Sequence, residues 1–202
     1  MIGATFMLTC SAYYHNYMCQ CESRMKYLRK FDLSGICIMI CVSATPPVFY
    51  GFMCEENQFY GSIFLGQIWT FCFVALYCTM GQGISKDEKH RKKIAAIAYL
   101  VAGYSTAPGM IYLAYYADPS TVYEFSVWVW FGGGILYAIG AIMYAMKFPE
   151  KHFPGKFDIW GNSHQWFHFF VLAAAFLQFF GSVRCFHERQ LYTCPESGRF
   201  DS

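Results

Sequence analysis

Charged residues are scarce in this chain. Asp, Glu, Lys and Arg make up 14% of its 202 residues, whereas a typical soluble domain contains about 25%. The net charge of +2 provides no strongly basic surface for nucleic acid, and 56% hydrophobic residues are too many for a disordered chain. The composition therefore excludes an ordinary soluble domain, a nucleic-acid-binding module and a disordered protein.

The few charged residues divide the chain into long apolar stretches. Each stretch is about long enough, at 1.5 Å per residue, to cross a hydrocarbon core of roughly 30 Å as a helix. We therefore expect an all-α, polytopic transmembrane helix bundle over residues 1–183, followed by a noncytoplasmic C-terminal tail at 184–202. The six expected spans lie near residues 1–20, 33–51, 60–81, 95–116, 126–146 and 162–183.

Basic residues predict the orientation of these spans. The connecting stretches 21–31, 83–93 and 147–158 hold 12 of the 15 Lys and Arg residues. In the connections between these stretches, all of the charged residues are acidic. Because basic loops are retained on the cytoplasmic side, these three stretches are expected to face the cytosol. With six spans, both ends of the chain then face away from the cytosol.

Cysteine is abundant, with ten residues. Cys54, Cys185 and Cys194 are expected on the noncytoplasmic side, where a disulfide among them is conceivable. The other seven cysteines lie in or near the spans, and we expect them to pack as small apolar side chains.

Three histidines lie inside apolar spans, namely His15, His164 and His168. Ionisable residues are costly in a membrane, so each of them is a candidate functional residue. His164 and His168 are four residues apart, which places both on one face of a helix and allows them to share a metal ion. A pair of histidines that forms hydrogen bonds between helices would explain the spacing equally well.

The predicted orientation places these histidines at a similar depth. His15 lies near the cytosolic end of the first span, and His164 and His168 lie two to three turns into the last span. Asp32 opens the second span at the same membrane face, and Ser11 lies one turn before His15. Three neutral imidazoles leave the fourth position of a tetrahedral Zn²⁺ open, which is the pattern of catalytic sites.

Asp32 and Ser11 are candidates for proton transfer and hydrogen bonding beside such a metal. Zn²⁺ lowers the pKa of its bound water from 15.7 toward about 7, and the Asp32 carboxylate could accept or relay a proton. Ser11 could form a hydrogen bond with the water, a substrate carbonyl or a neighbouring group. Two structural alternatives remain open, because Asp32 could cap the second helix and the Ser11 hydroxyl could bond back to its own helix.

Two motifs resemble those of a known family. The stretch 148–176, FPEKHFPGKFDIWGNSHQWFHFFVLAAAF, resembles the signature of the progestin and adipoQ receptor family, the adiponectin-receptor-like and hemolysin III-related membrane proteins. Ser11-x-x-x-His15, followed by Asp32 in FDLSGI, resembles that family's second motif. Members have seven helices, so the resemblance implies that the first span here corresponds to the family's second helix and that the family's first helix is missing.

The resemblance also implies a function. It implies Zn²⁺ held by His15, His164 and His168, with Asp32 and Ser11 close to it. The expected protein is a multi-pass receptor of the plasma membrane or an endomembrane, acting in lipid signalling or metabolism through zinc-dependent hydrolysis of a ceramide-like lipid amide.

Other roles and partners are compatible with the same residues. The alternative is a signalling receptor with a purely structural zinc site and no enzymatic activity. Expected partners are a membrane lipid as substrate or ligand, an extracellular protein or a steroid, and further copies of the chain. A transporter fits less well, because the sequence places no pairs of opposite charge inside the spans.

Overall fold

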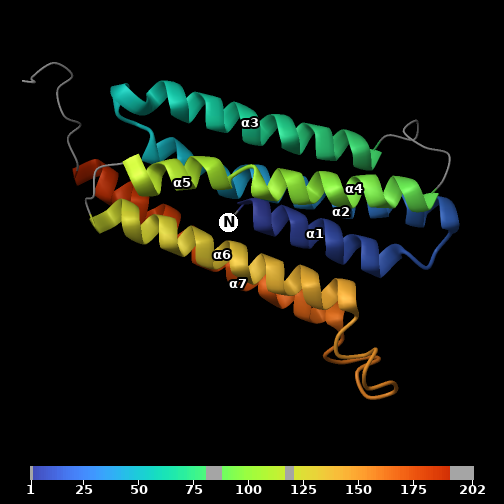
Figure 1. The fold of residues 1–202 in the computed structure, drawn as a ribbon. Helices are drawn as coiled ribbons and strands as arrows, with labels where there is room; N and C mark the ends of the chain where they lie inside the picture. The colour runs from blue at the N-terminus through green and yellow to red at the C-terminus, as the bar shows by residue number, and fades with distance from the viewer. Residues whose placement is uncertain (1, 81–87, 117–120, 192–202) are drawn as a thin grey trace, which may run out of the picture. The chain divides into compact units, whose positions relative to one another are not determined.

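The computed structural model describes residues 2–80, 88–116 and 121–191, and these residues form seven α-helices and no strand. Five helical stretches among them are long and apolar enough to cross a membrane. The prediction of an all-α membrane protein is therefore confirmed. The helices are α1 (Ile2–Tyr17), α2 (Glu22–Gly51), α3 (Glu55–Met80), α4 (Glu88–Tyr104), α5 (Ala107–Tyr116), α6 (Thr121–Met146) and α7 (Ser163–Leu191) (Figure 1).

Several helix ends differ from the predicted spans. α1 has 16 residues and is not among the five helices of spanning length. α7 continues through Leu191 into the expected tail, and an ion pair between Arg184 and Glu188 links successive turns of this extension at 3.6 Å. Charged residues therefore do not end these helices, because outside the apolar region they can support a helix through pairs one turn apart.

α2 begins at Glu22, well before the predicted start of its span. The basic stretch expected to be a loop is helical, and an ion pair between Lys26 and Glu22 at 2.6 Å stabilises its first turn. The residue at the N-cap position is Cys21. Asp32 therefore lies in the helix interior, and the interpretation of Asp32 as a helix cap is wrong.

The fourth predicted span, 95–116, is interrupted between α4 and α5. Ser105 and Thr106 form a turn, and their hydroxyl groups donate to carbonyl oxygens of the preceding turn at 2.7 and 2.9 Å. Pro108 follows in the first turn of α5, where its missing N–H is tolerated. From α3, the Gln67 amide donates to the Ser105 carbonyl oxygen at 3.4 Å. The break therefore places a group of polar side chains and backbone atoms at one depth of an otherwise apolar span.

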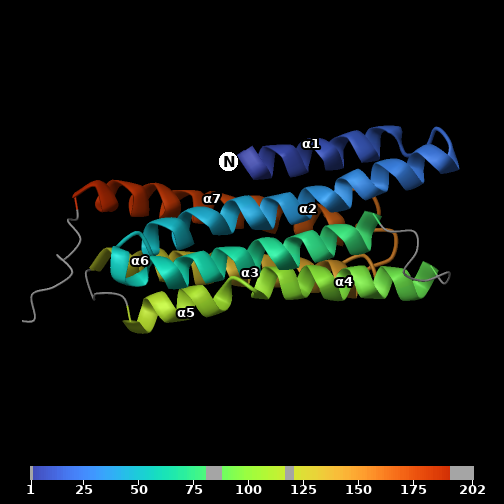
Figure 2. The same cartoon turned by 90° about the horizontal axis from the view of Figure 1, so that it is seen from above.

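The chain divides into two compact units, and unit 1 comprises Met1–Ala117 and Arg189–Ser202. Within unit 1, α1 packs on α2, α2 on α3 and α3 on α4 (Figure 2). Glycines allow the first of these contacts to be close. A Cβ atom on Gly3 would lie 3.3 Å from the Met39 Cα, and one on Gly35 would lie 3.0 Å from the Met7 Cα. This is the small-residue packing typical of membrane helices.

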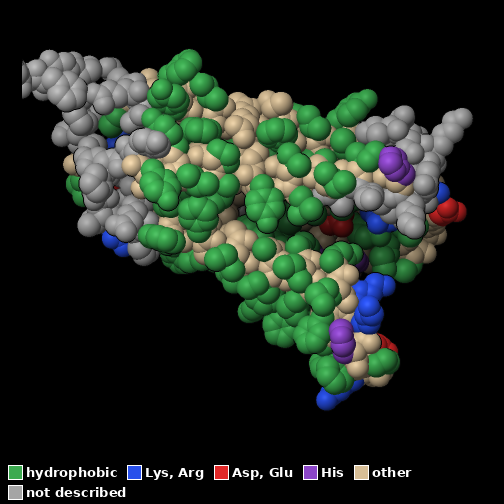
Figure 3. Space-filling view, viewed as in Figure 1, with side chains coloured by type: hydrophobic (Ala, Val, Ile, Leu, Met, Phe, Trp, Pro, Cys, Tyr) green, Lys and Arg blue, Asp and Glu red, His purple; other side chains and the backbone are tan. Residues whose placement is uncertain are grey.

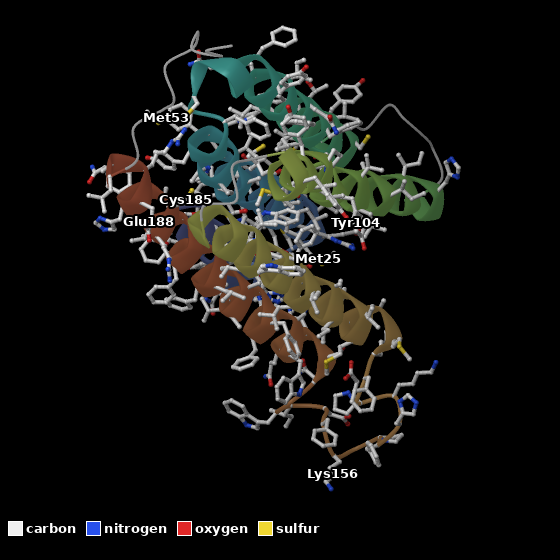
Figure 4. The ribbon with its side chains drawn as sticks, turned by 60° about the vertical axis from the view of Figure 1, so that its left-hand side comes forward. Met25, Met53, Tyr104, Lys156, Cys185 and Glu188 are labelled. Carbon is white, nitrogen blue, oxygen red and sulfur yellow. The ribbon has the colours of Figure 1, made fainter. Side chains whose placement is uncertain are left out.

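Unit 2 comprises Asp118–Glu188 and contains α6, the connection 147–162 and most of α7. The two helices are antiparallel and meet at Gly140, where an added Cβ would lie 3.0 Å from the Phe170 Cβ. Lys156 lies in the connection at one end of the unit, and Cys185 lies on α7 at the other (Figure 4). The connection therefore returns the chain directly into a second antiparallel helix.

Large apolar side chains remain exposed along the helices of both units, and Figure 3 shows them on one face. Phe59 is 71% exposed, Phe73 60% and Trp128 67%. Such extensive apolar exposure is incompatible with water but suits the hydrocarbon core of a bilayer.

The expected disulfide among the three outer cysteines can be followed in part. Cys54 is disulfide-bonded, whereas Cys185 is buried and does not belong to a disulfide. Cys194 lies outside the described residues.

Candidate metal centre

The structure brings His164 and His168 together on α7. Their Nε2 atoms are 3.2 Å apart. Two Zn–N bonds of about 2.0–2.1 Å that meet at a tetrahedral angle separate their nitrogens by about 3.3 Å. The pair therefore fits two corners of one tetrahedral zinc site. The same distance also suits a hydrogen bond between the two rings if one nitrogen carries a hydrogen.

Aromatic side chains hold the His164 ring in place. Tyr144 of α6 lies against it with ring centroids 5.4 Å apart, and Phe167 contacts Tyr144 at 5.6 Å. The close approach of the helices at Gly140 brings Tyr144 within reach. Packing between α6 and α7 therefore restricts the orientation of the first histidine of the pair.

The beginning of α7 is capped by side chains of the 147–162 connection and the first turn. The Ser163 N–H donates to Glu150 Oε2 at 2.8 Å, and the Ser163 hydroxyl donates to the other carboxylate oxygen of Glu150. Asn162 Oδ1 accepts from the Gln165 N–H at 3.0 Å, and Gln165 Oε1 accepts from the Gly161 N–H at 2.6 Å. This reciprocal pattern resembles a capping box and fixes the helix start immediately before the histidine pair.

Glu150 is ionised in this arrangement. Its surroundings partly desolvate the carboxylate, which raises its pKa, but the hydrogen bonds from Ser163 and the charge of Lys147 act in the opposite direction. The net effect lowers the pKa of Glu150 below its ordinary value. A negative charge at this position also complements the dipole of α7.

The remaining predicted site residues belong to unit 1. Ser11 and His15 lie one turn apart on α1; Ser11 is buried and His15 is exposed. Asp32 is half-buried on α2 and acts electrostatically on the Cys10 thiol of α1. The antiparallel contact of α1 with α2, set at Gly35, therefore places Asp32 near the level of Ser11.

Sequence reasoning missed the residues that support the histidine pair. The role of Glu150 depends on the path of the connection, which no local pattern specifies. The Asn162-x-x-Gln165 spacing, however, is a recognisable helix-start signal and was available in the sequence. Tyr144 offered no signal beyond its place in an apolar helix.

Comparison with known proteins agrees with these motifs. The family described as haemolysin-III related matches residues 1–179. Heptahelical transmembrane protein 4 of Arabidopsis thaliana is 33% identical over 182 residues, which cover 88% of this chain and 45% of that protein. The adiponectin receptor protein of Drosophila melanogaster is 31% identical over 193 residues, which cover 95% of this chain and 43% of that protein.

A third relative carries the name of the receptor family that the two motifs resemble. Progestin and adipoQ receptor-like protein 1 of Caenorhabditis elegans is 29% identical over 205 residues, which cover 96% of this chain and 44% of that protein. The chain thus spans less than half the length of each of these three relatives. With this match and its apolar helices, the chain belongs to the haemolysin-III-related family of integral, multi-pass membrane proteins.

Proposed function

We propose that this chain is a receptor-like membrane protein that acts in lipid signalling or metabolism by hydrolysing a ceramide-like lipid amide at a zinc site. The proposed ligands are His15, His164 and His168. The 3.2 Å separation of the His164 and His168 Nε2 atoms carries the proposal, because it matches two ligands of one tetrahedral ion. The family match over residues 1–179 supports it, since those residues include all three histidines.

The imidazole donors suit zinc rather than a hard cation, which prefers oxygen ligands. Three histidines leave one of four coordination positions for water or substrate. Zn²⁺ bound there would supply Lewis-acid chemistry for activating water and polarising the amide carbonyl.

Asp32 and Ser11 are proposed to act on the reacting groups. The Asp32 carboxylate accepts a proton from the attacking water and delivers it to the amine nitrogen that leaves. The Ser11 hydroxyl donates a hydrogen bond to the carbonyl oxygen as negative charge develops on it. One water is consumed, and one fatty acid and one amine are released. The apolar helices accommodate the acyl chain.

The proposed orientation follows the basic loops. The connection 147–158 faces the cytosol under the positive-inside rule, so the histidine pair lies in the cytosolic part of the membrane. Lipids dissolved in the bilayer would then reach the site from the side.

Asp32→Asn tests the catalytic proposal. Fatty-acid release from a ceramide is measured on the purified, zinc-loaded protein. We expect the variant to lose about 10²–10⁴-fold in rate, the usual contribution of a general acid–base group, while keeping its zinc and its fold. Glu22→Gln is the matched control, because it neutralises an exposed carboxylate on the same helix. Full activity in Asp32→Asn, or no activity in a zinc-loaded wild type, would contradict the proposal.

A receptor with a structural zinc is the second candidate. It is favoured by the printed names of two relatives, an adiponectin receptor protein and a progestin and adipoQ receptor-like protein. An extracellular protein or a steroid would then be the ligand. Under this reading, His164→Ala destabilises the protein and Asp32→Asn has almost no effect. The Asp32→Asn experiment therefore separates the two candidates.

A further inference from the structure

Large apolar side chains are exposed on the connection 147–162, between α6 and α7. Trp160 is 80% exposed, Ile159 75% and Phe153 51%. These residues belong to neither helix, so the lipid-facing surface of a membrane span does not account for them. Exposed apolar patches of this kind mark interaction sites.

Hydrogen bonds hold this connection in a defined shape. The Gly155 N–H donates to Asp158 Oδ1 at 3.3 Å, which closes a turn around Lys156. The Gln165 side-chain amide, in the first turn of α7, donates to the Ile159 carbonyl oxygen at 3.0 Å. The exposed apolar side chains therefore belong to an ordered segment that is tied to the beginning of α7.

Basic side chains accompany the apolar ones on this connection (Figure 3). Lys151 and Lys156 are exposed, and the Lys156 ammonium lies 5.8 Å from the centre of the Phe157 ring. The two acidic residues of the connection already have partners, because Glu150 caps α7 and Asp158 closes the turn. Within the described part of the chain, neither of these two lysines forms a salt bridge. Their positive charges are available to an anionic partner.

The membrane surface is within reach of the apolar side chains. Ile159 and Trp160 precede Ser163, the first residue of α7, by four and three residues. At 3.3–3.6 Å per extended residue, their Cα atoms lie within about 10–14 Å of the start of that helix. The headgroup layer of a bilayer is about 5–8 Å thick on each side of the hydrocarbon core, and Trp is enriched in this layer. Lipid headgroups are therefore the nearest available partner.

We propose that the connection 147–162 is a binding site for anionic phospholipids of the adjacent leaflet. Ile159 and Trp160 insert between the headgroups, and Lys151 and Lys156 bind their negative charge. Segments that combine aromatic and basic side chains bind lipid surfaces through buried apolar area and electrostatic attraction. The basic loops predict that this leaflet faces the cytosol, where anionic lipids give the membrane a negative surface potential.

Thermal unfolding of the purified full chain in a neutral detergent tests the site. Dioctanoyl phosphatidylglycerol is the anionic probe, and dioctanoyl phosphatidylcholine is the neutral one. A ligand that binds only the folded protein raises the unfolding midpoint, so the anionic lipid should raise it more than the neutral lipid. Each lysine near an anionic surface increases the affinity about fivefold. The half-saturating concentration should therefore rise about 25-fold in the double variant Lys151→Gln, Lys156→Gln.

Arg184→Gln is the matched control, because it removes a positive charge that is paired with Glu188 near the opposite end of α7. Its response to phosphatidylglycerol should equal that of the wild type. Trp160→Ser should also weaken binding but keep the salt dependence, because salt screens the charges of the lysines and not the apolar contact. Equal responses of the wild type to the two lipids, or an unchanged half-saturating concentration in the double variant, would overturn the proposal.

Fluorescence quenching tests the insertion without depending on the lysine variants. The signal of Trp160 is the difference between the wild type and Trp160→Phe, both in nanodiscs that contain phosphatidylglycerol. Lipids brominated near the headgroup should quench this signal, and acrylamide in the water should quench it weakly. Strong quenching by acrylamide and none by brominated lipid would overturn the proposal and indicate a cytosolic protein as the partner of this surface.

Discussion

Replacing Gly35 with alanine tests the packing that positions α1 against α2. Gly35 lies in α2, three residues after Asp32, and its missing side chain lets the backbone of α1 approach. An added Cβ would lie 3.0 Å from the Cα and 3.3 Å from the Cγ of Met7. A backbone atom cannot move aside as a flexible side chain does, so α1 must shift away from α2.

The expected cost follows from two opposing terms. Overpacking at a close contact costs about 1–3 kcal/mol, while replacing glycine in a helix interior with alanine gains roughly 0.5–1 kcal/mol. Gly66→Ala measures the second term, the gain, by itself. Gly66 lies in α3 with no atom within 4 Å of the added Cβ, so this variant has only the gain. Subtracting the two variants leaves about 1–3 kcal/mol of packing energy.

The assay is thermal unfolding of each variant in one detergent at one protein concentration. For a chain of this size, 1 kcal/mol shifts the midpoint by about 2–4 °C. Gly35→Ala should therefore unfold about 2–12 °C below Gly66→Ala. Equal midpoints for the two variants would refute the close contact between α1 and α2 and the level assigned to Asp32 beside Ser11.

Three further predictions concern the α7 cap, the Tyr99 network and the α6–α7 contact. Glu150→Gln removes the anionic partner of Ser163 and should lower the unfolding temperature at pH 7. Folding lowers the pKa of Glu150, so its carboxylate stabilises the folded protein above the unfolded pKa of about 4.3, and this stabilisation is lost as the pH falls through the folded pKa. The unfolding temperatures of wild type and variant should therefore converge in acid. A constant difference at all pH values argues against the cap. Tyr99→Phe removes a hydroxyl group bonded to α2 and α3 and should cost about 1–3 kcal/mol in denaturant unfolding; an unchanged midpoint argues against that network. Gly140→Ala should unfold at a lower temperature than Gly134→Ala, whose added Cβ meets no atom within 4 Å, and the reverse order contradicts the α6–α7 contact.

Much of the fold was predictable because the membrane constrains sequence strongly. Apolar stretches of spanning length can satisfy their backbone only as helices, and the structure has helices in all six predicted spans. The ends were less predictable. Charged residues stop a span without stopping a helix, as the early start of α2 at Glu22 shows. The break before Pro108 was not predictable, because the sequence does not show which carbonyl oxygens accept hydrogen bonds from the hydroxyl groups in the turn.

The candidate site was predictable where its geometry is local. The separation of His164 from His168 by four residues implied one helix face, and their Nε2 atoms are 3.2 Å apart. Features that depend on distant contacts were missed. Glu150 reaches Ser163 only through the fold of the connection.

Zinc content of the purified full chain tests the central claim most directly. Metal is measured per chain in the wild type, in His15→Ala, in His168→Ala and in His187→Ala, a control on α7 outside the proposed ligands. The account predicts one zinc per chain in the wild type and the control, and almost none in the two ligand variants. A wild type without zinc, or ligand variants that keep it, would contradict the account.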